Sequence, residues 1–387
     1  MFLALRDLRF ATGRFALMGS VVALISLLLV MLSGLTAGLG GQNTAAIDRL
    51  GEQGVQRLVF GGAAGQEPTA SFTQSEFTVA QRDAWAATDG VASVEPLGVS
   101  QGRAIGLEHP VDTDPQGRAD VSGEPTTGVA TTAFIGLTPG GSDAPTGVEP
   151  GEIVLSQDVA DSLHAQAGDA VAVSGFVYTV ADVVPTEYYS HSPVTWLALE
   201  DWNAISHTAD DAVLGTAGLV RFDAGADVDA VAAAGDDAAG TVAETVKGSY
   251  AALPSYRSEN GSLMTMQGFL YGISALVVIA FLSIWTVQRT RDIAVLKALG
   301  GSNGWVLKDS LAQAAFVLVG GVAVGTGLAA VVGAFAGRAV PFELSWATTA
   351  VPAAGVLVLG MLAAVVAVYR VTRIDPLVAR GGVDLGA

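Results

Sequence analysis

Cysteine is absent from this chain of 387 residues, and histidine occurs only four times. Without cysteine the chain cannot form disulfides, thiolate metal sites or cysteine-held iron–sulfur clusters. The four histidines are not spaced as metal ligands, and a lone exposed histidine is usually only a polar side chain. We therefore predict no resident metal site, and we expect His191, in the segment TEYYSHSPVTW, simply to belong to a loop that leads into a strand.

Charged residues are also scarce. They make up 14% of the chain, whereas hydrophobic residues make up 51% and the mean hydropathy is +0.49. A soluble domain is about a quarter charged, so part of this chain is expected to lie in lipid. The net charge of -18 and the pI near 4.4 have the wrong sign for binding phosphate backbones, which excludes nucleic acid as a partner.

The motifs of several large enzyme classes are missing too. The chain has no G-x-x-x-x-G-K-[ST] loop for nucleotide phosphates, no H-E-x-x-H and no G-x-S-x-G. The pair Gly300–Gly301 is followed by Ser-Asn-Gly-Trp rather than by Lys-Ser. We predict that the chain is not an enzyme and has no catalytic residues.

Four long apolar stretches, by contrast, are each long enough to cross a membrane, which takes about 20 helical residues. None of them contains Asp, Glu, Lys or Arg, and they cover residues 15–37, 268–288, 311–333 and 348–369. The first, preceded by three arginines, is an alternative candidate for a secretory signal. Its length and the lack of a small-x-small cleavage site favour a span. Residues 1–14 suit an amphipathic helix on the inner membrane surface, in contact with lipid.

The positions of the charges predict the orientation. Segments 1–14, 289–310 and 370–387 together hold ten Lys and Arg against five acidic residues, whereas segment 38–267 holds eight against 31. Because positive loops stay inside, we expect a multi-pass cell-membrane protein whose termini and 289–310 loop are cytoplasmic. Segment 38–267 is then an extracytoplasmic domain with helical stalks, inserted between the first span and the other three.

The inserted segment alternates strand-like and helix-like pieces, which predicts an α+β domain. We expect a helix over Val79–Thr88 followed by an extended segment, a strand in GEIVLS and a helix in QDVADSLHAQ. AVAVSGFVYTVADVV should form two strands about a Ser-Gly turn. PVTWLAL should form another strand, with a helix from Glu200 after it. The fold class is thus an α-helical membrane protein with four transmembrane helices (1+3) and an inserted α+β domain.

The cytoplasmic loop 289–310 reads as a hairpin of two short helices. An apolar stripe runs along its first helix through Ile293, Leu296, Leu299 and Gly300. Such a stripe either lies on lipid headgroups or forms an exposed apolar surface for a cytoplasmic partner.

Two cytoplasmic segments then carry a family resemblance. RDIAVLKALGGS and VTRIDPLVAR resemble the two signatures of FtsX-like permeases of the MacB type, with Asp292 where the family has Glu and Gly301 where it has Ala. The resemblance implies the permease half of an ABC transporter: a homodimer beneath which two copies of a separate ATPase subunit bind ATP and Mg. Such permeases work by mechanotransmission, and Asp292 and Lys297, with the apolar stripe, would contact the ATPase.

Within that family, YYSHSPVTW and LPSYRSENGSLMTMQGFLYGISALV resemble the haem-efflux permeases. This implies haem as substrate and no permanently bound cofactor. Glu259 would supply the axial oxygen to the haem iron and Arg257 would neutralise a propionate. Tyr256, Met264 and Glu52 are the other expected contacts.

Simpler interpretations stay open at this point. SYRSENGS is equally typical of a solvated stalk or helix cap, and Met31 in the first span is more typical of packing than of ligation. Two other functions are also compatible with the resemblance: a regulator of cell-wall hydrolases, or an exporter of a lipid, lipoprotein or peptide.

The charge distribution makes a direct prediction about topology. A reporter fused after Ala387 should report the cytoplasm, and one inserted at Gly140 should report the exterior, because the cations gather on the segments expected inside. Paired reporters, one active in the cytoplasm and one active outside it, measure the side of the membrane on which each site lies. An opposite result at either site would remove the four-span topology.

Overall fold

The computed structural model describes residues 12–63, 66–206, 212–288 and 303–372. They divide into two units, each described by itself. One comprises Met1–Leu39 and Asn260–Ala387, and the other comprises Gly40–Glu259. We call them the helical unit and the α+β unit.

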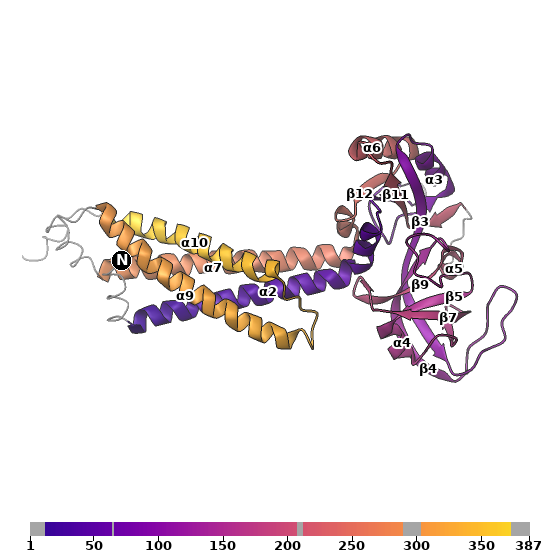
Figure 1. Cartoon of the computed structure of the whole chain (residues 1–387), viewed down its shortest axis with the longest axis horizontal. Coiled ribbons are helices and arrows are strands. Elements are labelled where there is room, and N and C mark those ends of the chain that lie inside the picture. The colour runs from indigo at the N-terminus through magenta and orange to yellow at the C-terminus, as the bar shows by residue number, and fades with distance from the viewer. Residues whose placement is uncertain (1–11, 64–65, 207–211, 289–302, 373–387) are drawn as a thin grey trace, which may run out of the picture. The chain divides into compact units, whose positions relative to one another are not determined.

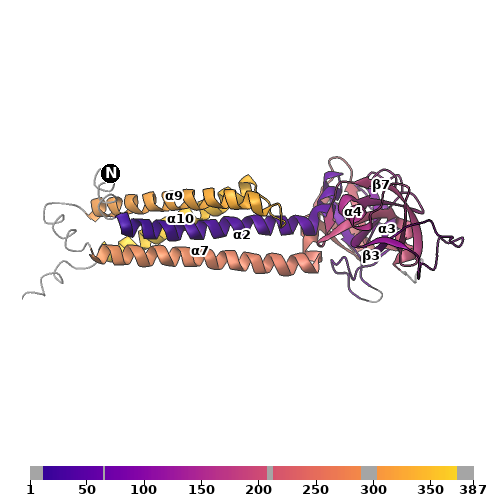
Figure 2. The same ribbon diagram turned by 90° about the horizontal axis from the view of Figure 1, so that it is seen from below.

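The helical unit is built on four long helices that run side by side (Figures 1 and 2). Within the described residues, four helices are long and apolar enough to cross a membrane, in agreement with the four predicted spans. Each helix is longer than the apolar stretch that predicted it: α2 is Thr12–Glu52, α7 is Pro254–Gln288, α9 is Asn303–Ala336 and α10 is Trp346–Thr372.

Helices α2 and α9 approach closely because glycine removes side chains from their interface. A Cβ atom on Gly321 would lie 2.9 Å from the carbonyl oxygen of Gly19, and one on Gly325 would lie 2.2 Å from that of Ala23. Small residues four apart are a common means of bringing membrane helices together. Gly321 and Gly325 therefore serve packing between two helices of the same chain.

The α+β unit contains the C-terminal end of α2, from Gly40, and the first residues of α7. Its described residues also form twelve strands and several short helices. The helices are α3 (Val79–Ala86), α4 (Gln157–Leu163), α5 (Leu199–Ile205), α6 (Val228–Ala239) and the 3-10 helix η1 (Gly248–Ala252). The strands are β1 (Arg57–Phe60), β2 (Phe77–Thr78), β3 (Val91–Leu107), β4 (Thr126–Leu137), β5 (Glu152–Ser156), β6 (Ala170–Val173), β7 (Phe176–Val184), β8 (Tyr188–Tyr189), β9 (Ser192–Ala198), β10 (Val213–Gly215), β11 (Ala217–Phe222) and β12 (Val242–Thr245).

Strand β3 joins two parts of the sheet (Figure 1). Its first half pairs antiparallel with β11, in the order β12-β1-β11-β3. Its second half pairs with β4, and the order continues β4-β9-β5-β7-β6. Because β6 also pairs with β3, at Ala104↔Val173, the second part closes on itself. Only a strand as long as β3 can belong to both parts.

The predicted elements of this unit are present. GEIVLS forms β5, and the first seven residues of QDVADSLHAQ form α4. Helix α5 starts at Leu199, one residue before the predicted Glu200. The Ser-Gly turn joins β6 to β7, with φ angles of 49° at Ser174 and 85° at Gly175. Strand β4 was not predicted, because Gly128 and Gly136 interrupt its sequence pattern. A Cβ on Gly136 would lie 2.5 Å from Cβ of Trp202, so α5 packs directly on the strand backbone.

A buried tryptophan organises the packing of α3 and α6. Trp85 is fully buried, and a Cβ on Gly235 of α6 would lie 2.5 Å from its ring. The indole N–H donates to the hydroxyl of Thr241 at 2.9 Å, and that hydroxyl donates to Asp236 at 2.8 Å. Burial raises the pKa of the Asp236 carboxyl, and the bonds from Ala243 and Thr241 oppose the shift.

Removing one hydroxyl should therefore destabilise this packing. Thr241→Val keeps the side-chain shape but leaves the buried indole N–H without its acceptor, which should cost about 1–3 kcal/mol of unfolding free energy. Denaturant unfolding of the full chain in detergent, followed by tryptophan fluorescence, measures this cost. Thr131→Val, at an exposed position of β4, is the matched control. Equal midpoints for the two variants would contradict the prediction.

Candidate functional site

Five polar side chains of the α+β unit meet, and we call them the polar cluster: Asn43 of α2, Ser190 and His191 between β8 and β9, and Ser255 and Glu259 of α7. The carboxylate oxygens of Glu259 lie 2.9 and 3.0 Å from Nε2 of His191. Nδ2 of Asn43 donates to Glu259 at 3.2 Å, and its Oδ1 accepts from Ser255 at 2.7 Å. The hydroxyls of Ser190 and Ser255 lie 2.8 Å apart. Side-chain hydrogen bonds thus join three separate segments.

The turn that carries His191 is backbone-bonded to α2. The N–H of His191 donates to the carbonyl of Gln42 at 2.9 Å, and that of Ser190 donates to the carbonyl of Asn43 at 3.1 Å. These contacts lock the tip of the β8–β9 hairpin against the outer end of α2.

The same turn is strained. Tyr189 pairs with Ser192, which leaves a two-residue turn whose φ angles are 48° at Ser190 and 63° at His191. Hairpin turns of this left-handed kind favour Asn and Gly, because a Cβ atom crowds the backbone there. Strain of this sort persists only where surrounding contacts enforce it, and it is concentrated at functional sites.

The cluster is partly open. Asn43 is 1% exposed, whereas the side chains of His191 and Glu259 keep 30% and 40% of their surface. A ligand can therefore reach the imidazole and the carboxylate, while the asparagine amide holds the carboxylate from the buried side.

His191 lies in a loop that leads into a strand, as expected. Its contact with Glu259 was not predicted. The two residues are 68 positions apart in the sequence and touch only because the hairpin folds against α2 and α7. The one available signal was the segment's pair of tyrosines and its histidine before a strand, which says nothing about Glu259.

The other predicted haem contacts are distributed differently. The ring of Tyr256 packs edge-on against Tyr250 at 5.4 Å, and the hydroxyl of Tyr250 donates to Asp48. Arg257 is exposed. Met264 belongs to the helical unit and is 61% exposed. Tyr256 thus serves the packing of the α+β unit, and Arg257 is open to solvent.

Glu52 lies in a separate groove of about 560 Å³ on the outer end of α2. The groove also contains Asp48, Arg49 and Glu187, and Nε of Arg49 lies 3.6 Å from Glu187. Burial raises the pKa of the Glu187 carboxyl, the Arg49 guanidinium opposes this rise, and Glu52 adds to it. Among the described residues, no group of three or more His, Asp or Glu side chains is arranged to hold a metal ion.

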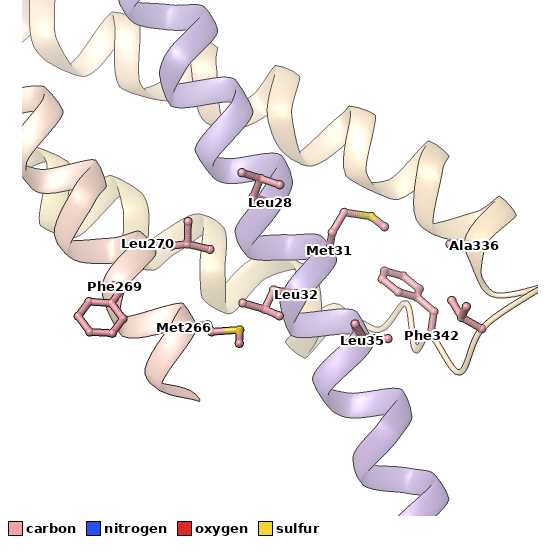
Figure 3. A pocket seen from close by; sticks show the side chains of 10 residues that line it. Leu28, Met31, Leu32, Leu35, Met266, Phe269, Leu270, Ala336 and Phe342 are labelled. Carbon is pink, nitrogen blue, oxygen red and sulfur yellow. The ribbon is translucent and has the colours of Figure 1, made fainter. Parts of the chain in front are cut away.

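The helical unit contains an apolar pocket of about 550 Å³ (Figure 3). Its walls come from α2, from α7, from the end of α9 and from the turn before α10. All ten side chains that line it are apolar: Leu28, Met31, Leu32, Leu35, Met266, Phe269, Leu270, Ala336, Val340 and Phe342. Met31, expected to serve packing, forms part of this wall with a second methionine, Met266. A pocket without charged walls suits an apolar or ring-shaped ligand.

The residues expected to contact an ATPase cannot be placed. Asp292, Ile293, Leu296, Lys297, Leu299 and Gly300 lie outside the described residues.

One protein family matches part of this chain. Residues 264–376 match the family described as FtsX-like permease C-terminal. The match includes the whole of RDIAVLKALGGS and the first six residues of VTRIDPLVAR. The chain thus contains the FtsX-like permease region that its two motifs predicted.

Particular relatives carry a more specific name. A protein of Staphylococcus haemolyticus (strain JCSC1435), provisionally named hemin transport system permease protein HrtB, is 29% identical over 132 residues, which cover 34% of this chain and 38% of the relative. Its namesake in Staphylococcus epidermidis (strain ATCC 35984) is 26% identical over 130 residues, 34% of this chain and 37% of the relative. The alignments span little more than a third of the relatives' length.

Two solved structures are also similar in part. The extracellular domain of the noncanonic ABC-type transporter YknZ from Gram-positive bacteria matches with a TM-score of 0.31 and 14% identity, over 48% of this chain and 95% of that one. The periplasmic region of MacB from Actinobacillus actinomycetemcomitans matches with a TM-score of 0.33 and 10% identity, over 50% and 89%. TM-scores of this size do not establish a shared fold.

The strained turn makes a prediction that separates strain from lost contacts. His191→Ala and His191→Gly both remove the imidazole, but only glycine relaxes the φ angle of 63°. The glycine variant should therefore be the more stable of the two by about 1 kcal/mol. Denaturant unfolding of the full chain measures the difference. If the alanine variant were equally or more stable, the turn would not store backbone strain.

Proposed function

We propose that this chain is the permease subunit of an ABC-type efflux pump that exports haem, or a similar amphipathic compound, from the membrane. The observation that carries the proposal is the FtsX-like permease region, residues 264–376, in a unit of four membrane-length helices. The name of the staphylococcal relatives, hemin transport system permease protein, supports haem as the substrate.

The apolar pocket suits the ring system of such a substrate. Its volume of about 550 Å³ is in the range of drug-sized ligand sites, and its walls supply apolar surface and one aromatic ring from each of Phe269 and Phe342. Met31 and Met266 add thioethers, a side chain that can ligate haem iron. An acyl chain would also fit these walls, so a lipid substrate is the second candidate.

The polar cluster of the α+β unit is a separate candidate binding site. Glu259 stays our candidate for an oxygen ligand to haem iron, and His191, within hydrogen-bonding distance of it, becomes a second donor. The exposed guanidinium of Arg257 would pair with a propionate. In the free protein the imidazole and the Asn43 amide hold the carboxylate, so a ligand would have to compete with these bonds.

The energy source and the partners follow from the same class. Two copies of a separate ATPase subunit would bind ATP and Mg, and a homodimer of this chain would convert their motion into movement of the α+β units. Asp292, Lys297 and the apolar stripe would contact the ATPase. In that scheme this chain needs no catalytic residue and no permanently bound cofactor.

Hemin titration of the purified full chain tests the substrate. Glu259→Ala and His191→Ala should each weaken binding by about tenfold, the size of one lost ligand or charged hydrogen bond, whereas the exposed-carboxylate control Glu149→Ala should not. A carboxylate ligand predicts a high-spin ferric spectrum that changes in Glu259→Ala. If the wild-type chain binds no hemin, haem is not the substrate. If both site variants bind like Glu149→Ala, the polar cluster is not the site.

A second measurement addresses the coupling between this chain and the ATPase subunit. Leu296→Asp places a charge on the apolar stripe of the cytoplasmic loop and should abolish ATP-dependent hemin tolerance in cells that depend on this chain. The variant should still accumulate in the membrane and bind hemin in detergent, since its changed residue lies on the loop and not in either site. Unchanged tolerance would show that the stripe lies on lipid rather than on an ATPase.

A further inference from the structure

One aromatic ring in the helical unit fits against two glycines, and the backbone next to it fits against a third. A Cβ on Gly34 of α2 would lie 2.3 Å from the ring of Phe342, and one on Gly333 of α9 would lie 2.5 Å from it. One on Gly38 would lie 2.2 Å from the carbonyl oxygen of Pro341. Gly34 and Gly38 are four residues apart on α2, so the ring and its backbone occupy a notch that any other residue would fill.

Backbone bonds hold the segment that carries this ring. The N–H of Glu343 donates to the carbonyl of Gly34 at 3.0 Å. Two residues on, Ser345 and Thr348 cap the start of α10: the Ser345 N–H donates to the Thr348 hydroxyl at 2.9 Å, and that hydroxyl lies 3.0 Å from the Glu343 carbonyl. The chain that directly follows the ring is therefore held both to α2 and to the start of α10.

The same ring lines the apolar pocket, with Met31 and Leu35 of α2 and Ala336 of α9 (Figure 3). Its surface is thus shared between the glycine notch and the cavity. The notch fixes where the ring stands, and the ring in turn limits the width of the cavity at that wall.

We infer that Phe342 is a specificity-determining residue of the apolar pocket, set in place by Gly34, Gly38 and Gly333. It excludes bulky occupants and offers a flat aromatic wall against which a planar ring packs by offset stacking. The identity of the occupant rests on the proposed function, whereas the role of the ring as a wall does not.

The absence of cysteine allows a test that needs no substrate. Ala336→Cys places a single thiol in the pocket wall, and its labelling by small N-ethylmaleimide and by bulky N-(1-pyrenyl)maleimide is compared in the full chain in detergent. Phe342→Ala should raise the rate with the bulky reagent about tenfold, as removal of a pocket wall does, and should change the rate with the small one little.

Glycine variants test what holds the ring. Gly34→Ala should change the ratio of the two rates, because its Cβ displaces the ring, but it should have no further effect in the Phe342→Ala background. Gly327→Ala is the matched control, since a Cβ there meets nothing within 4 Å. An unchanged ratio in Phe342→Ala, or an equal effect of Gly34→Ala with and without the ring, would overturn the inference.

Hemin titration of the same variants separates this inference from the proposed function. If haem occupies the pocket, Phe342→Ala should weaken hemin binding about tenfold. A changed labelling ratio with unchanged hemin binding would uphold the wall and remove haem from the pocket. An unchanged labelling ratio with weakened hemin binding would instead support haem in the pocket and overturn the role of the ring as a wall. The ring would then contact haem without limiting access to the pocket.

Discussion

Contact between helix backbones is the constraint on which the helical unit depends. At Gly321 and Gly325 helix α9 lies so close to α2 that a single added Cβ would overlap main-chain atoms. In lipid there is no hydrophobic force to press helices together, and close packing over small residues takes its place. Once α2 and α9 are this close, Gly34 of α2 and Gly333 of α9 form the notch that receives Phe342, and the apolar pocket takes its shape from that ring.

The α+β unit meets a different constraint, because its hydrogen bonds must hold a strained turn. Ser190 and His191 adopt backbone angles that their side chains disfavour, and the carbonyls of α2 and the carboxylate of α7 enforce them. The turn, the outer end of α2 and the start of α7 therefore form one hydrogen-bonded assembly. A movement of either helix end relative to the turn would break these hydrogen bonds.

Local patterns predicted most of the elements and little of the sites. The apolar stretches, the Ser-Gly turn and the start of α5 were predicted correctly, because each depends on residues next to one another in the sequence. Strand β4 was missed because Gly136, which weakens a strand pattern, is required where Trp202 packs. The pairing of His191 with Glu259 was not predicted, because no sequence pattern in either segment indicates contact with the other.

The sequence by itself determined that this is a membrane protein with an FtsX-like permease region. Membrane crossing depends on the length and polarity of continuous segments, and the permease region was predicted from two short motifs, so neither needs a fold. Only the tertiary structure decided which residues meet. Asn43 contacts His191, which is 148 positions away in the sequence, and Glu259, which is 216 positions away. The ring of Phe342 packs against Gly34 and Gly333. Contacts of this range are set by the packing of whole helices and strands, and that packing is not encoded at any one position.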